Sequence, residues 1–108
     1  MCGILGVLFS IPNGNNNPLN TIEQLLHRGP DDCGEWKDKY IQLGHTRLSI
    51  LDLSPLGHQP MSCQNERFWI TFNGEIYNYL ELRQELINLG YRFKSQSDTE
   101  VLLAAYAH

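Results

Sequence analysis

The sequence has little positive charge. Its 108 residues include 8 Lys and Arg but 12 Asp and Glu, so the net charge is -4 and the pI is near 5.4. A domain that binds nucleic acid needs a basic surface to neutralise phosphates, and an anionic membrane attracts the same residues. We therefore expect neither nucleic acid nor a membrane surface as a partner.

The sequence also lacks a long hydrophobic run. The opening stretch from Gly3 to Phe9 is apolar, but it is far shorter than the roughly 20 residues of a membrane-spanning helix. It has no basic flank before it and no small-residue cleavage site behind it, which a secretory signal peptide would require. We expect a cytoplasmic protein.

Cysteine is scarce and irregularly placed. Cys2, Cys33 and Cys63 are the 3 cysteines, and no pair has the C-x-x-C spacing. An odd, widely spaced set argues against both a disulfide framework and a zinc knuckle. His27, His58 and His108 show no metal-binding spacing with one another or with the thiols. Cys33 and Cys63 are most simply structural or surface thiols, and we expect no metal site.

The composition is that of one globular domain. Hydrophobic residues make up 42% of the chain, enough for a core that buries roughly two-thirds of the unfolded surface. Gly3 to Phe9 is expected to be a strand. Its apolar side chains alternate, with Ile4 and Leu8 on one face and Leu5, Val7 and Phe9 on the other. Because both faces are apolar, the strand is expected to lie between two covering layers.

Periodicity and turn residues predict the other elements. The middle of the chain is expected to hold a helix from Asn17 to Leu26 stopped by Gly29-Pro30, a hairpin from Gly34 to Leu43 turning near Lys37 to Lys39, and an extended stretch through Leu51. An irregular loop from Ser54 to Gln64 and a strand from Arg67 to Phe72 are expected to follow.

The C-terminal part is expected to be helical. Tyr79, Leu82, Leu86 and Leu89 form one stripe of a helix from Tyr77 to Leu89, stopped by Gly90. Ser97 and Glu100 match a capping box, which predicts a second helix continuing through Val101 to Tyr106. That helix ends without a Gly or Asn stop and without a basic last turn. We therefore expect this chain to be a fragment of a longer protein.

Cys2 is a candidate N-terminal nucleophile. It follows Met1 directly, so removal of Met1 would place a thiol and a free α-amino group on one residue. A thiol attacks only as its thiolate and needs a base, because its ordinary pKa is about 8.5. An α-amino group, with an ordinary pKa of about 7.7 to 8.0, is suited to that role near neutral pH. A small residue at the second position is also common in proteins without such a function.

Three further segments place polar residues beside expected strand or helix ends. Arg47 is suited to hold a carboxylate by paired hydrogen bonds, although an Arg there is often only a surface residue. Asn73-Gly74 is a turn signal, and its side-chain amide and backbone N–H also match an oxyanion hole. Asp98 either favours the positive end of the second helix or binds a substrate ammonium.

The order of these segments resembles the class II glutamine amidotransferases, which are N-terminal nucleophile hydrolases. The similarity is closest to the N-terminal glutaminase domain of glutamine-hydrolysing asparagine synthetases. The segments that carry it cover essentially the whole chain: Cys2-Gly3, His27-Arg28-Gly29-Pro30-Asp31, Gly44-His45-Thr46-Arg47-Leu48-Ser49-Ile50-Leu51-Asp52-Leu53, His58-Gln59-Pro60-Met61, Asn73-Gly74-Glu75-Ile76-Tyr77-Asn78 and Ser97-Asp98-Thr99-Glu100.

The resemblance implies a role for each matching residue. Cys2 corresponds to the nucleophile that attacks the side-chain amide of L-glutamine and forms a thioester. Asn73 and the backbone N–H of Gly74 correspond to the oxyanion hole, Arg47 to the clamp on the substrate α-carboxylate, and Asp98 to the acceptor for its α-ammonium. The backbone from Leu48 through Ser49 and Ile50 to Leu51, and that of Glu75, would complete the glutamine pocket.

The resemblance also implies an α/β fold, the four-layer αββα sandwich of this superfamily, of which residues 1–108 would be the N-terminal portion. In the family a synthetase domain uses the ammonia, with ATP and Mg, to convert aspartate to asparagine, and the parent enzyme is a possible homodimer. The Ser-Gly-Gly pyrophosphate motif of that domain is absent from this sequence. No cofactor is expected in the chain itself.

Other interpretations stay open at this point. His45 beside Arg47 is expected to be structural, because the free amino group already supplies a base. Arg28 and Asp31 are expected to brace a loop near the site through an ion pair. A truncated, non-catalytic glutamine-binding or interaction module is the main alternative function. A redox-sensing thiol protein is a third, although no resolving cysteine stands at C-x-x-C spacing.

Overall fold

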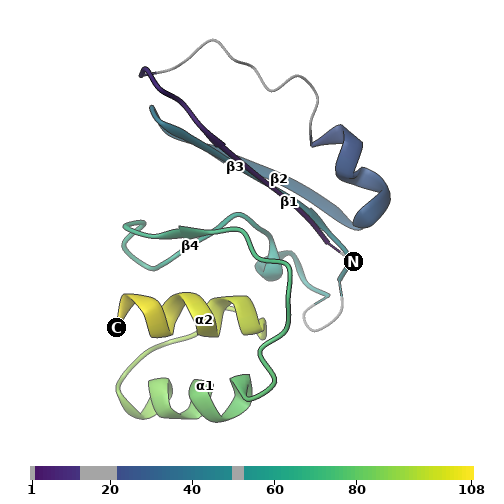
Figure 1. The fold of residues 1–108 in the computed structure, drawn as a ribbon. Coiled ribbons are helices and arrows are strands. Elements are labelled where there is room, and N and C mark those ends of the chain that lie inside the picture. The colour runs from purple at the N-terminus through teal and green to yellow at the C-terminus, as the bar shows by residue number, and fades with distance from the viewer. Residues whose placement is uncertain (1, 13–21, 50–52) are drawn as a thin grey trace.

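The computed structural model describes residues 2–12, 22–49 and 53–108 (Figure 1). Three strands form its larger sheet: β1 (Gly3–Leu8), β2 (Asp32–Lys37) and β3 (Ile41–Arg47). They are antiparallel in the order β1-β3-β2, so β3 is central. Asp38 turns the chain between β2 and β3, because its Oδ1 accepts the backbone N–H groups of Tyr40 and Ile41 at 2.8 and 2.9 Å. The hairpin predicted near Lys37 to Lys39 is confirmed.

A second, smaller sheet faces the first. It pairs β4 (Met61–Ser62) with β5 (Trp69–Ile70), and Trp36 of β2 stacks on Trp69 with ring centroids 4.5 Å apart. The predicted strand from Arg67 to Phe72 is therefore shorter than expected, because strand pairing ends at Ile70. The predicted irregular loop from Ser54 to Gln64 contains β4 and a 3₁₀ turn, η2 (Pro55–Gly57).

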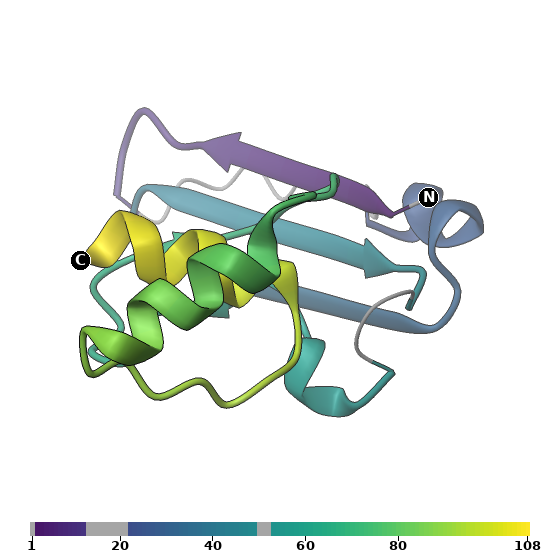
Figure 2. The ribbon, with the colours of Figure 1, turned by 90° about the horizontal axis from the view of Figure 1, so that it is seen from below.

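Two helices complete the stack of layers. α2 (Asp98–Ala107) packs on β4 and β5, and α1 (Tyr79–Asn88) packs on α2 (Figures 1 and 2). Leu86 of α1 is buried against Val101 and Ala104 of α2. The helix predicted from Tyr77 to Leu89 is thus confirmed with slightly shorter bounds. Leu89, which the stripe placed in the core, is 63% exposed because it lies past the last helical turn.

Gly90 ends α1 as predicted. Its φ of 97° lies in the left-handed region, which glycine adopts without the steric cost that a Cβ brings. Its N–H donates to the carbonyl of Ile87 at 2.9 Å, which satisfies one acceptor of the last helical turn.

One expectation for β1 is wrong. Phe9 is buried and Leu5 and Val7 are half-buried, but Ile4 and Leu8 on the other face are 49% and 82% exposed. The reason is the position of β1 at the edge of the sheet (Figure 2). The register places Ile4 and Leu8 on the face that Trp36 presents to the smaller sheet. The smaller sheet packs over β2, as the Trp36–Trp69 stack indicates, and leaves much of this face of β1 exposed.

The first predicted helix is described only in part, because residues 13–21 lie outside the described ranges. The described portion, η1 (Glu23–Arg28), is a 3₁₀ helix rather than an α-helix. It ends at Gly29, where the predicted stop is confirmed. η1 lies beside β1 and β3. None of the described helices has both the length and the apolar composition that crossing a bilayer requires.

At the start of α2, one of the two hydrogen bonds of the predicted capping box forms. The Ser97 hydroxyl accepts the Glu100 backbone N–H at 3.3 Å. Instead of returning to Ser97, the buried Glu100 carboxylate accepts the N–H groups of Lys94 and Ser95 at 2.9 and 2.7 Å and the Ser95 hydroxyl. Glu100 thereby folds the segment before the helix into a fixed turn.

We predict that Glu100→Gln lowers the free energy of unfolding by about 2 kcal/mol, because the amide replaces an acceptor oxygen with a donor and leaves a buried N–H unpaired. Urea unfolding measures this change. Glu85→Gln, an exposed change on α1, is the matched control and should shift stability by less than about 0.5 kcal/mol. Equal effects of the two substitutions would contradict this account of α2.

Candidate active site

The C-terminal end of the central strand β3 carries three buried polar residues, His45, Thr46 and Arg47. The register of β1 on β3 pairs Gly3 with Thr46, so Cys2 lies beside the chain as it leaves β3. The Cys2 Sγ accepts the Leu48 backbone N–H at 3.3 Å and can donate to the Leu48 carbonyl at 3.7 Å. These two contacts hold the sulfur beside the backbone of Leu48.

Contacts on both sides fix the backbone around Cys2. The Gly3 N–H donates to the Thr46 hydroxyl at 3.1 Å, and that hydroxyl donates to the Leu25 carbonyl at 2.9 Å. A Cβ at Gly3 would lie 2.6 Å from the Thr46 Oγ1 and 2.9 Å from the Leu25 Cβ. Only glycine therefore fits directly after Cys2. Arg28 Nε also donates to the Cys2 carbonyl at 3.3 Å.

Arg47 is buried at the end of β3 with only 8% of its surface exposed. Its Nη1 donates to the Ser54 carbonyl at 2.9 Å, and its guanidinium packs against the Cα of Gly57, where no side chain would fit. The loop after β3 therefore holds the guanidinium in place. Among the described residues, no carboxylate forms an ion pair with Arg47. A guanidinium held in this way is suited to bind an anionic group.

The segment after β5 carries Asn73, Gly74 and Glu75. Phe72, just before it, donates its N–H to Gln59 Oε1 at 2.7 Å and places its carbonyl 3.1 Å from His45 Nε2. A Cβ at Gly74 would lie 2.8 Å from the Phe72 ring, so a larger residue there would displace the ring. Side chains, rather than strand pairing, thus hold the backbone that leads to Asn73.

Asp98 is the first residue of α2 and is 6% exposed. Its Oδ2 accepts the Ile76 N–H at 2.9 Å, which fixes the far end of the segment that contains Asn73 to Glu75. A negative side chain at the first position of α2 also interacts favourably with the positive end of the helix dipole. Asp98 therefore stabilises the start of α2 and also presents an acidic group to the pocket.

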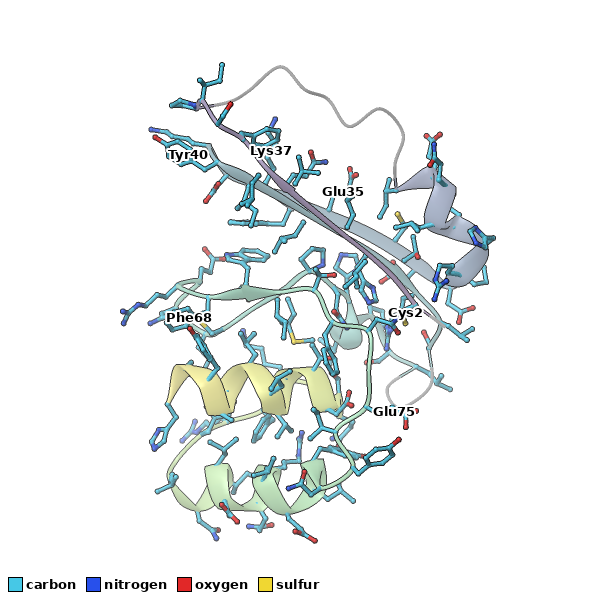
Figure 3. The ribbon with its side chains drawn as sticks, in the orientation of Figure 1. Cys2, Glu35, Lys37, Tyr40, Phe68 and Glu75 are labelled. Atoms are coloured by element: carbon cyan, nitrogen blue, oxygen red, sulfur yellow. The ribbon has the colours of Figure 1, made fainter. Side chains whose placement is uncertain are left out.

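These segments line one pocket of about 430 Å³, a volume within the range of small-molecule sites. Seven of the residues singled out from the sequence line it: Cys2, Arg47, Leu48, Asn73, Gly74, Glu75 and Asp98. In Figure 3, Cys2 and Glu75 lie at the same end of the molecule, away from Tyr40 and Phe68.

The other residues that were predicted to line the pocket either lie outside its lining or are not described. Ser49 is not part of the pocket lining and donates its N–H to Asp31 Oδ2 at 2.8 Å. Ile50 and Leu51 lie outside the described residues, as does Met1. The expected ion pair between Arg28 and Asp31 is wrong for the described side chains, because Arg28 bonds to the Cys2 carbonyl and Asp31 to Ser49.

Several pocket residues were not predicted as site residues. They come from segments next to those that were: His45, Gly57, Gln59, Phe72, Tyr77, Ser97 and Thr99. Gln59 is the most connected of them, since its side chain bonds to both Phe72 and Thr99. A signal for it was the Gly-His-Gln-Pro turn, but a turn sequence does not reveal that one of its side chains is buried.

The other thiols are placed differently from Cys2. Burial, followed by the charges of Glu35 and Asp32, raises the pKa of Cys33, which disfavours its reactive thiolate. Cys63 is buried, donates to Asn65 Oδ1 at 2.9 Å and accepts the Phe68 N–H at 3.2 Å. Neither thiol lines the pocket. Within the described ranges, no group of three His, Cys, Asp or Glu side chains is arranged to hold a metal ion.

His45 is 1% exposed, and its ring binds the Phe72 carbonyl. Burial lowers its pKa below the ordinary 6.5, Arg47 and His58 lower it further, and the Phe72 bond and Asp32 oppose the change. His45 is therefore neutral near pH 7. Its bond to Phe72 requires the Nε2–H tautomer, which agrees with the structural role expected for it.

We predict that His45 makes folding stability depend on pH. Its folded pKa lies below the unfolded value of 6.5, so as pH falls the unfolded chain takes up the proton first and stability decreases. Urea unfolding at about pH 7.5 and about pH 5.5 should show this decrease, and His45→Gln should reduce it. His27→Gln, at an exposed position, is the control and should leave it unchanged. An unchanged dependence in His45→Gln would refute the assignment.

Comparison with known proteins identifies the family of this chain. The glutamine amidotransferase domain family matches residues 1–108. The chain is 46% identical over 113 residues to asparagine synthetase [glutamine-hydrolyzing] 1 of Bacillus subtilis (strain 168), covering 100% of this chain and 18% of that protein. It is 39% identical to the putative asparagine synthetase [glutamine-hydrolyzing] 2 of Methanocaldococcus jannaschii, covering 98% and 24%.

A third relative, amidase chry2 of Gibberella zeae, is 32% identical over 123 residues, covering 100% of this chain and 18% of that protein. The chain thus spans no more than 24% of the length of these three relatives. The family match nevertheless extends over all of residues 1–108. This chain therefore belongs to the glutamine amidotransferase domain family.

Proposed function

We propose that this domain hydrolyses the side-chain amide of L-glutamine to glutamate and ammonia through a thioester on Cys2. The observation that carries the proposal is the pocket itself. Cys2, Arg47, Asn73-Gly74 and Asp98 come from four separate parts of the chain and line one cavity. A nucleophile, an anion-binding cation, two oxyanion donors and a buried carboxylate are the groups that hydrolysis of a free amino-acid amide needs.

The chemistry starts when Met1 is removed. The freed α-amino group of Cys2 takes the proton from its thiol, and the sulfur attacks the amide carbon of glutamine. The Asn73 side-chain amide and the Gly74 N–H donate to the negative oxygen of the tetrahedral intermediate. The carbon–nitrogen bond then breaks, and the amino group returns its proton to the departing ammonia. A γ-glutamyl thioester on Cys2 remains.

Water completes the reaction. The same amino group takes a proton from a water molecule, whose oxygen attacks the thioester carbon. The tetrahedral intermediate again uses the donors of Asn73 and Gly74. The carbon–sulfur bond breaks, the proton returns to sulfur, and glutamate leaves. One residue therefore supplies both the nucleophile and the base.

Recognition of glutamine uses its two charged groups. We assign the α-carboxylate to Arg47, which can bind it through two parallel N–H groups, and the α-ammonium to Asp98. Leu48 and Glu75, which line the same pocket, complete the glutamine site in this proposal. A glutamine residue within a protein chain lacks both free charged groups, so the Arg47–Asp98 pair selects the free amino acid.

The wider assignment rests on the relatives. Several are named glutamine-hydrolysing asparagine synthetases, which supports transfer of the ammonia to aspartate by a synthetase domain that uses ATP and Mg. The facing sheets, with helices on the outer side of the smaller one, support the αββα N-terminal nucleophile hydrolase fold. A cytoplasmic location and a homodimer of the parent enzyme complete this proposal.

Hydrolysis should require a free α-amino group on Cys2. In a variant with one Gly inserted between Met1 and Cys2, that nitrogen becomes an amide and cannot accept a proton. We expect ammonia release from glutamine to fall at least about 100-fold, while glutamine binding measured by calorimetry changes little.

A Gly added after His108 is the matched control and should leave turnover unchanged. Undiminished turnover in the variant with the inserted Gly would contradict the mechanism. If the unaltered protein, with Met1 removed, bound glutamine without releasing ammonia, a glutamine-binding module would be the better description.

A further inference from the structure

Gln59 joins two parts of the site that are distant in sequence. Its side chain is 7% exposed. Its Oε1 accepts the Phe72 N–H at 2.7 Å, and its Nε2 donates to the Thr99 hydroxyl at 3.2 Å. Breaking either bond would leave a buried polar group unpaired, which costs free energy. The amide is therefore a fixed link between the residue before Asn73 and the first turn of α2.

The backbone that Gln59 holds pairs with no strand in the described part of the chain. Ladder pairing of β5 ends at Ile70. Beyond that point, Thr71 Oγ1 donates to the Gly44 carbonyl at 3.0 Å, and the Phe72 carbonyl lies 3.1 Å from His45 Nε2. The Phe72 N–H has only the Gln59 bond among those observed. Gln59 thus fixes the last backbone donor before the oxyanion segment.

The other end of this segment is attached to the same turn of α2. Ile76 donates its N–H to Asp98 at 2.9 Å, and Asp98 is adjacent to Thr99. The residues from Asn73 to Glu75 therefore form an arch whose two ends both rest on the start of α2. Through Thr99, Gln59 sets where one of these ends stands relative to Asp98.

We propose that Gln59 is a positioning residue that sets the spacing between the oxyanion donors and Asp98, and that this spacing selects substrate side-chain length. The inference rests on the proposed function, in which Asn73 and Gly74 meet the amide and Asp98 meets the α-ammonium. Glutamine and asparagine differ by one methylene between those two groups. If the distance between the oxyanion donors and Asp98 is fixed, only the longer side chain of glutamine reaches both. If the segment from Asn73 to Glu75 is loosened, this distance varies and the preference for glutamine decreases.

The test is kinetic. Gln59→Met keeps the length of the side chain and removes both hydrogen bonds. We expect kcat for glutamine to fall between about 10-fold and 100-fold, because a displacement of about 1 Å has that effect, while KM changes little. The preference for glutamine over asparagine in kcat/KM should also fall, since one methylene in a fixed pocket is worth about 10-fold to 200-fold.

Gln64→Met is the matched control. Gln64 is exposed and bonds to the Arg92 carbonyl away from the site, so its loss should change neither kcat nor the substrate preference. Thr99→Val is a second variant that preserves volume and breaks only the α2 end of the link. Because Gln59 and Thr99 act through one bond, their effects on kcat should not add, and the double variant should match Gln59→Met within about twofold.

Amide hydrogen exchange gives a readout that does not need turnover. Exchange at Phe72, Asn73 and Gly74 should quicken in Gln59→Met and Thr99→Val but not in Gln64→Met. Unchanged exchange, kcat and preference in folded Gln59→Met and Thr99→Val, or fully additive effects, would overturn the proposal. If the unaltered protein releases no ammonia, the proposed function fails, and the exchange data still decide whether Gln59 holds the arch.

Discussion

Hydrogen bonds from polar side chains buried at the end of β3 hold the candidate site together. Thr46 fixes Gly3 and thereby Cys2, and His45 binds the Phe72 carbonyl just before Asn73. Arg47 follows in the same run and is held by the Ser54 carbonyl. Successive residues of a strand point to opposite faces. The end of β3 therefore contacts β1 and η1 through Thr46 and the segment after β5 through His45.

This design places polar groups where a small domain would otherwise place its core. Buried polar groups cost stability unless each has a partner. The partners here are backbone groups of neighbouring segments and, for Gln59, also the Thr99 hydroxyl, so the bonds that satisfy His45, Thr46 and Gln59 also shape the pocket. In the described part of the chain, an apolar cluster of buried residues lies between α1 and α2 around Leu86 and Val101. None of the residues of this cluster lines the pocket.

The sequence predicted those parts of the fold and site that depend on local patterns. The hairpin around Asp38, the helix ending at Gly90 and the Ser97 cap follow from residues close together in the chain. The pocket location of Arg47, Asn73 and Asp98 came from the family resemblance, which preserves residue order. Their roles as clamp, oxyanion donor and ammonium acceptor remain predictions.

The remaining features depend on contacts between distant segments. The exposure of Leu8 follows from the edge position of β1, and the early end of β5 follows from side-chain bonds that replace strand pairing. The link from Gln59 to Thr99 spans 40 residues. Periodicity and turn chemistry describe neighbours in sequence, so they contain no information on such contacts.

The central claim is that Cys2, once Met1 is removed, is the nucleophile of a glutamine-specific pocket. The most direct test is mass spectrometry of the folded protein after incubation with the glutamine analogue 6-diazo-5-oxo-norleucine, followed by peptide mapping. We predict a single adduct, on Cys2 as the first residue, and its suppression by excess glutamine. An adduct on Cys33 or Cys63, or no adduct on folded protein whose Met1 is gone, would contradict the account.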